Sequence, residues 1–276
     1  MESRGARWAI RIGAGVTLAF LYVPLLVLAV YAFNDSITRA WPPELWTTRW
    51  FAAAWRDPLV RTALAGSVQA ALGATLVALV LGSLAAFAVH RFRFFGREAI
   101  SIALVLPIAL PGIVTAIALS SAIEFANAWF GLTYSVWTII IGHATFCIVV
   151  VFNNVIARLR RTPTSLVEAS MDLGADGFQT FRYVTFPAIR TALVAGALLA
   201  FGLSFDEIVV TNFTAGPKLT LPIWIFNNIR TPRQQPVVNV VALVLMLVSI
   251  VPVYLSQRLA AGEGATGFLR ARDDAA

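Results

Sequence analysis

The sequence predicts an all-α protein that forms a polytopic membrane bundle of six transmembrane helices. Two features of its composition point to this class. Hydrophobic residues make up 59% of the 276 positions, and charged residues only 13%, whereas soluble domains carry about 25% charged residues. The apolar residues are also gathered into long runs without a charge, as a series of membrane-crossing helices requires.

Five uncharged runs are long enough to cross a bilayer, since each exceeds the ~20 helical residues that span ~30 Å of hydrocarbon. These runs are residues 12–34, 62–89, 99–123, 125–157 and 234–257. A sixth run, 191–205, has 15 residues and reaches only about 22 Å as a helix. To cross the membrane, this helix must extend through Asp206 and Glu207. The six helices are therefore expected near 10–33, 63–89, 100–123, 134–157, 190–212 and 237–257.

The distribution of arginine and lysine predicts the orientation. One set of helix flanks carries 14 of these residues and the opposite set carries 7, and the richer side is normally cytoplasmic. Both termini are thus expected in the cytoplasm, with residues 1–276 forming a single transmembrane domain. The net charge of +7 is explained by this bias. No soluble basic face indicates a nucleic-acid partner, so the expected surroundings are the lipid bilayer.

Sequence signatures of catalysis are missing. There is no phosphate-binding G-x-x-x-x-G-K-[ST] motif, and the sole lysine, Lys218, lies outside any such glycine pattern. No H-E-x-x-H motif and no serine nucleophile elbow is present, and the one cysteine, Cys147, has no partner for a disulfide. His90 and His143 are far apart, so structural roles are expected. We therefore predict a non-enzymatic protein without catalytic residues, metal site or bound cofactor.

A loop at residues 158–190 separates the fourth and fifth predicted helices. Ser165 and Glu168 have the spacing of a capping box and predict a short helix over 166–173 that stops at Gly174. Asp176 and Gln179 repeat the spacing and predict a second helix over 177–184. By itself, this pattern indicates a cytoplasmic helical hairpin in which Glu168 serves only as a cap.

The stretch "EASMDLGADGFQTFRYVTFP" resembles the EAA loop of permease subunits of ABC importers. Glu168, Ala169, Gly174 and Pro187 match the family pattern, while Ser170 stands where the family has alanine. Val184 and Phe186 also replace other apolar residues. The resemblance implies that Glu168, Ala169, Ser170, Gly174 and Pro187 couple this chain to an ATPase, through a cytoplasmic coupling helix.

The same resemblance covers most of the chain. Residues 205–230 are similar to spermidine and putrescine permeases. The implied partners are a cytoplasmic ABC ATPase dimer that binds the ATP, a second homologous permease and an extracytoplasmic solute-binding protein, all at a bacterial inner membrane. The implied substrate is a small cation such as a polyamine, and other small amines, opines and phosphonates remain alternatives. An ion-coupled secondary transporter is the other class considered, although no internal repeat indicates it.

Asp206 and Glu207 are the unusual residues of the predicted fifth helix. A carboxylate at the centre of a bilayer costs about 2.5–3.5 kcal/mol, and such residues are functional candidates. One interpretation places them on the path of a cationic substrate, with Glu124 at the outer end of the third helix adding negative charge. The alternatives are that one acid pairs with an arginine of a neighbouring helix or subunit, and that Glu124 is simply a solvated helix end.

The predicted third helix contains two prolines four residues apart, Pro107 and Pro111. Each removes a backbone donor and bends a helix. We expect paired kinks that serve in gating, with a plain packing role as the alternative.

Overall fold

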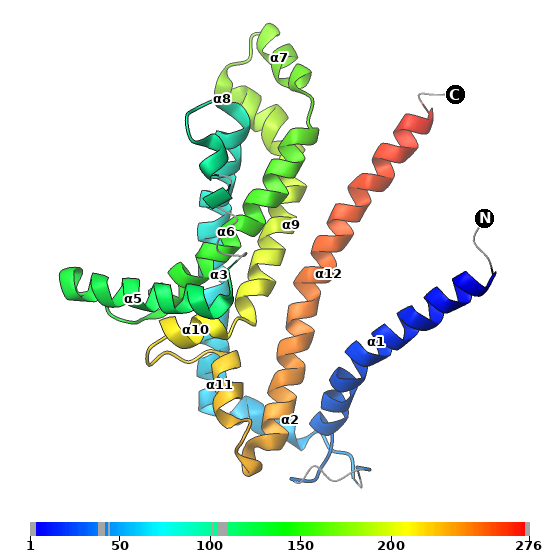
Figure 1. The fold of residues 1–276 in the computed structure, drawn as a ribbon, viewed down its shortest axis with the longest axis vertical. Helices are drawn as coiled ribbons and strands as arrows, with labels where there is room; N and C mark the ends of the chain where they lie inside the picture. The colour runs from blue at the N-terminus through cyan, green and yellow to red at the C-terminus, as the bar shows by residue number, and fades with distance from the viewer. Residues whose placement is uncertain (1–3, 38–41, 44, 101, 104–109, 274–276) are drawn as a thin grey trace. The chain divides into compact units, whose positions relative to one another are not determined.

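The computed structural model describes residues 4–37, 42–43, 45–100, 102–103 and 110–273, with side chains from residue 5 to 259. The helices are α1 (Arg4–Ala32), α2 (Arg49–Arg56), α3 (Pro58–Arg91), α5 (Gly112–Phe130), α6 (Val136–Arg161), α7 (Thr164–Asp172), α8 (Gly177–Thr180), α9 (Phe186–Phe205), α10 (Val209–Thr214), α11 (Leu221–Asn228) and α12 (Gln235–Asp273). A π-helical turn, Phe181–Thr185, joins α8 to α9, and a 3₁₀ turn, Pro232–Gln234, precedes α12 (Figure 1).

Six helical segments of the described chain are long and apolar enough to cross a membrane: Gly5–Ala32, Pro58–Arg91, Gly112–Phe130, Val136–Arg161, Gly177–Phe205 and Pro232–Leu259. No strand occurs among the described residues, so the prediction of an all-α polytopic bundle is confirmed. The chain divides into two compact units, one of residues 1–61 and 224–246 and the other of residues 62–223 and 247–276.

In the first unit, the connection after α1 is tied to the start of α2. Arg49 forms an ion pair of 2.9 Å with Asp35 and also donates to the Asp35 carbonyl. The Trp50 indole donates to the Asn34 carbonyl at 3.0 Å, and the rings of Phe33 and Phe51 lie 5.0 Å apart. These contacts hold residues 33–35 against the start of α2.

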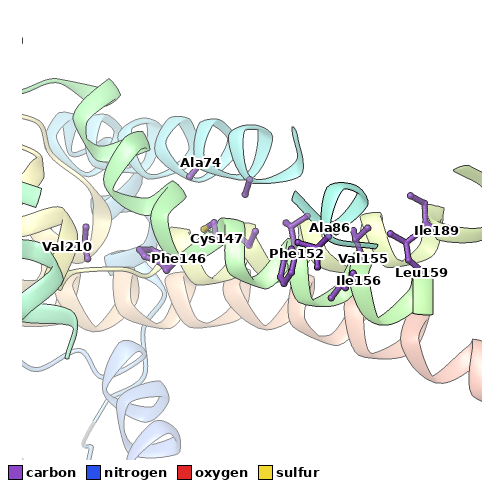
Figure 2. Close-up of a cluster of buried hydrophobic side chains, with 14 of the residues drawn as sticks. Ala74, Ala86, Phe146, Cys147, Phe152, Val155, Ile156, Leu159, Ile189 and Val210 are labelled. Carbon is purple, nitrogen blue, oxygen red and sulfur yellow. Dashed lines mark hydrogen bonds between the residues drawn. The ribbon is translucent and has the colours of Figure 1, made fainter. Parts of the chain in front are cut away.

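The second unit is built on α6, the most buried of the six segments. Its face of Phe146, Cys147, Val151, Phe152 and Val155 packs with small residues of α3 and with α9 into one apolar cluster (Figure 2). Because helices in lipid associate through close packing, small residues are needed where backbones approach.

Glycines mark these close approaches. A Cβ at Gly82 of α3 would lie 2.8 Å from the Ile148 carbonyl oxygen of α6, and one at Gly196 of α9 would lie 3.3 Å from the Val151 Cα. A Cβ at Gly142 of α6 would lie 3.0 Å from Val210 of α10. The helix α6 is thus in tight contact with three neighbours, and this core positions both parts of the candidate site.

Candidate transport site: a coupling loop and a helix break

The loop between α6 and α9 folds into α7 and α8, as the sequence predicts. Gly174 ends α7 with a φ of +86°, a backbone conformation that glycine adopts without strain. The Gly174 N–H donates to the Met171 carbonyl at 2.9 Å, and the Ala175 N–H donates to the Ser170 carbonyl at 3.0 Å. This is the Schellman pair of bonds that closes a helix end, so the predicted turn at Gly174 is confirmed.

One side-chain contact joins the halves of the loop, and two more stabilise α8 at its start. The Ser170 hydroxyl donates to the Val167 carbonyl at 2.8 Å and lies 2.9 Å from the Thr180 hydroxyl. Asp176 caps α8 by accepting from the Gln179 N–H at 2.7 Å, while the Gln179 side chain accepts from the Asp176 N–H at 3.0 Å. The second predicted capping box is therefore confirmed, and Ser170 has a structural use that an alanine would lack.

The first predicted capping box is wrong. Helix α7 starts at Thr164, after Pro163, and no side chain caps it. Ser165 therefore lies inside the first turn, and Glu168 is not held as a cap. Because Pro163 has no N–H and its φ of −61° is already compatible with a helix, the chain enters the helix there without a serine cap.

No residue of α7 is buried within the chain. Glu168 and Ala169 are exposed, and large apolar side chains of the loop project outward: Leu166 is 52% exposed, Leu173 89% and Phe178 73%. A cavity of about 510 Å³ lies behind the loop, where Glu168 and Met171 face His90 of α3 and Leu159 of α6. The loop therefore presents an apolar outer surface and leaves space beneath it.

Pro187 lies in the first turn of α9. The predicted second loop helix and the predicted membrane helix are in fact continuous, because the π-helical turn Phe181–Thr185 joins them. Because a proline has no N–H, Pro187 cannot continue the α-helical hydrogen-bond ladder. The π-helical turn ends at Thr185, two residues before this proline.

Asp206 and Glu207 do not lie inside a helix, so the prediction of one helix over 190–212 is wrong. Helix α9 ends at Phe205, and α10 begins at Val209. Asp206 is the exposed residue that follows α9. Glu207 is half-buried, and its Oε1 accepts from the Val210 N–H at 3.0 Å. The two acids therefore form a break between helices, where Glu207 satisfies a backbone donor at the start of α10.

His143 of α6 holds this break from both sides. Its ring is buried, with Nδ1 2.7 Å from the Ser204 hydroxyl and Nε2 2.8 Å from the Thr211 hydroxyl. Since the Thr211 hydroxyl donates to the Glu207 carbonyl at 2.7 Å, it accepts from His143 Nε2–H. Nδ1 of the neutral ring then accepts from Ser204. One side chain thus connects the last turn of α9 with the first turn of α10.

Sequence reasoning assigned His143 a structural role but missed what it positions. Its two hydrogen-bond partners lie 61 and 68 positions away in the sequence, and no local spacing pattern predicts such a pairing. The only available signal was a histidine within an uncharged run, since a buried imidazole in a membrane helix needs polar partners.

The third predicted helix also has other bounds than expected. Residues 104–109 lie outside the described residues, and so does Pro107. Pro111 is not a kink inside a helix: it precedes α5 with extended backbone, φ −55° and ψ 129°. Glu124 is an exposed residue within α5 rather than at its end, because the helix continues to Phe130 and closes at Gly131 with a φ of +70°.

Neither acid of the break forms an ion pair with a described residue, so an arginine partner within the described chain is not found. Among the described residues, no group of three or more His, Cys, Asp or Glu side chains could hold a metal ion. The arrangement offers one exposed carboxylate, one half-buried carboxylate and a helix end fixed by buried hydrogen bonds.

These features define a multi-pass membrane protein with an exposed loop between α6 and α9 and a broken helix. The chain belongs to the family of binding-protein-dependent transport system inner membrane components, which it matches over residues 78–261. It is a transmembrane permease subunit of an ABC importer for a small solute, and it is a multi-pass inner membrane protein. Permease subunits of this family work with a separate ATPase.

Curated relatives match most of the chain. The putrescine transport system permease protein PotI of Escherichia coli strain K12 is 35% identical over 238 residues, which cover 84% of each chain. The spermidine/putrescine transport system permease protein PotC of Haemophilus influenzae is 32% identical over 244 residues, which cover 88% of this chain and 92% of the relative.

The fold is also found among solved structures. A chain of a bacterial ABC transporter involved in the import of the acidic polysaccharide alginate superimposes with a TM-score of 0.68, covering 94% of this chain and 98% of that chain. The sequence identity is 16%. The similarity therefore describes the fold, and it carries no information on the substrate of this chain.

Proposed function

We propose that this permease imports a polyamine such as spermidine or putrescine, and that the α9–α10 break is a station on its path. The observation that carries the proposal is the placement of Asp206 and Glu207 at the break, without a cationic partner among the described residues. The similarity to PotI and PotC supports the same substrate class.

The energetics favour a cation at this place. A carboxylate and an ammonium about 4 Å apart attract by about 4 kcal/mol at an effective dielectric constant of about 20, before desolvation is subtracted. If a quarter of this attraction survives, removing one charge changes a rate about fivefold. Because Asp206 is exposed and Glu207 is partly occupied by the Val210 N–H, Asp206 is the residue that first meets the substrate.

The partners follow from the family and from the loop. A binding protein delivers the solute outside, a second homologous permease completes the membrane path, and a cytoplasmic ABC ATPase dimer binds and hydrolyses the ATP. This chain itself is then non-enzymatic and holds no cofactor. The exposed apolar side chains around Glu168 and Ala169 are the surface that meets the ATPase, and both termini lie on that side of the membrane. Ser170 and Gly174 shape the loop, and Pro187 marks its junction with α9.

The test compares Asp206→Asn and Glu207→Gln with Glu98→Gln, which removes one exposed charge from a site distant in sequence from the break. Uptake of labelled putrescine and spermidine is measured per assembled complex in proteoliposomes that contain all partner subunits. We expect a several-fold fall for Asp206→Asn at normal assembly, and no change for Glu98→Gln. Unchanged uptake per complex in both acid variants would remove these acids from the path.

A further inference from the structure

A second cavity in the larger unit has a chemistry unrelated to a cationic solute. Its volume is about 330 Å³, and it lies between the last turns of α6, the first turns of α9 and Leu259 of α12. The polar lining consists of Asn153, Asn154, Arg158, Arg161 and Thr191, and the remaining lining is alanine and leucine. No carboxylate is among the lining residues within the described part of the chain.

Two arginines give the cavity its charge. The Arg158 Nε donates to the Ala188 carbonyl at 2.8 Å, so this guanidinium is held against the start of α9. Arg161 follows almost one turn later on α6 and is exposed. A cavity whose described lining has two guanidinium groups and no carboxylate repels polyamines and attracts an anion. A guanidinium is suited to phosphate oxygens because its N–H groups form a planar fork.

The position along α6 is that of a membrane boundary. Asn153 lies within the uncharged run 125–157, whereas Arg158 and Arg161 follow it. From Asn153 to Arg161 the helix rises about 12 Å. That distance covers a headgroup layer together with the first part of the hydrocarbon, given that the interfacial regions add about 5–8 Å on each side.

We propose that this cavity binds the phosphate group of an anionic phospholipid of the inner leaflet. Arg161 and Arg158 supply positive charge to the phosphodiester, and Asn153, Asn154 and Thr191 face its glycerol oxygens. The alanines and Leu259 contact the first carbons of the acyl chains. The volume suits a headgroup rather than a whole lipid, and basic pockets between helices on the cytoplasmic side are typical sites of this kind.

The proposal rests on the orientation given under the proposed function, since the cavity must face the inner leaflet. The test therefore reads lipid binding directly and not only uptake. The intact complex is purified, exchanged into phosphatidylcholine nanodiscs with a minor fraction of phosphatidylglycerol, and released for native mass spectrometry to count retained phosphatidylglycerol molecules. The variants are Arg161→Gln and the matched control Arg160→Gln, whose side chain is also exposed but does not line the cavity.

We expect Arg161→Gln to weaken phosphatidylglycerol retention about fivefold and Arg160→Gln to leave it unchanged. Equal retention in the two variants overturns the proposal, as does a loss of subunit assembly in Arg161→Gln without any change in retained lipid. In a second arm, inorganic phosphate is added at millimolar concentration. If phosphate displaces the lipid, or stabilises the complex as well as the lipid does, the cavity binds a soluble phosphate ligand and not a lipid. A complex that retains the lipid but fails to import polyamines would contradict only the proposed substrate.

Discussion

Replacing His143 by leucine will loosen the α9–α10 break while preserving the volume at that point of α6. The substitution removes both ring nitrogens and leaves the Ser204 and Thr211 hydroxyls without their present partner. Thr211 keeps its bond to the Glu207 carbonyl, so the loss is limited to two hydrogen bonds between helices.

The magnitude follows from these two bonds. Hydrogen bonds between membrane helices contribute about 0.6 kcal/mol each on average and at most about 1.7. Losing both costs about 1–3 kcal/mol, which raises the population of an open break about 5- to 150-fold. His143→Asn keeps a polar group near the Nδ1 position, so it should preserve the Ser204 contact and give a smaller effect.

Hydrogen–deuterium exchange of residues 204–212 measures the opening directly, together with uptake per assembled complex. The matched control is Cys147→Ala, one turn along α6, because the only polar contact it removes is a weak one of 3.4 Å to the Ala200 carbonyl of the same α9. We expect faster exchange and lower uptake for His143→Leu alone. If exchange and uptake stay at the wild-type level in His143→Leu, the imidazole does not position the break.

Three further predictions concern the loop and the core. Gly174→Ala should lower uptake and loosen α7, because a side chain is strained at a φ of +86°. The control is Gly177→Ala, which should be tolerated in the same assay because Gly177, like Gly174, has open space around it. Gly82→Ala should reduce the yield of folded chain, because the new Cβ would lie 2.8 Å from the α6 backbone and force α3 away from it. The control Gly112→Ala should fold normally, since the atom nearest to its new Cβ is 3.9 Å away. Equal yields of the two variants would refute the packing argument. Glu168→Lys should abolish co-purification of the ATPase with the permease at normal membrane abundance, and normal co-purification would exclude this side chain from the contact.

The six membrane-crossing segments could be predicted because length and hydropathy are properties of each segment alone. The turn at Gly174 and the cap at Asp176 could be predicted for the same reason, since their hydrogen bonds lie within a few residues. The family resemblance rested on this local pattern, and the comparison confirmed it.

The break at Asp206 and Glu207 could not be predicted in this way. Hydropathy reports whether a segment tolerates lipid, and it does not report whether the helix is continuous. The break is stabilised by Glu207 capping the Val210 N–H and by His143 on another helix, and that second contact depends on the tertiary fold. The bounds of α5 were missed because the charge of Glu124 was taken as the end of a helix, whereas Gly131 ends it.

The helical run from Gly177 to Phe205 has a mechanical consequence. It begins in the loop proposed to meet the ATPase and stops directly before Asp206, 29 residues later, so its length is about 43 Å. Measured from Pro187, near its base, the helix rises about 27 Å to Phe205, so a tilt of about 5° at that residue displaces the far end by about 2.4 Å. The π-helical turn and Pro187 interrupt the regular bonding near the base and form the natural pivot. A lever of this shape lets a small push at the loop move the acidic break by nearly the length of a hydrogen bond.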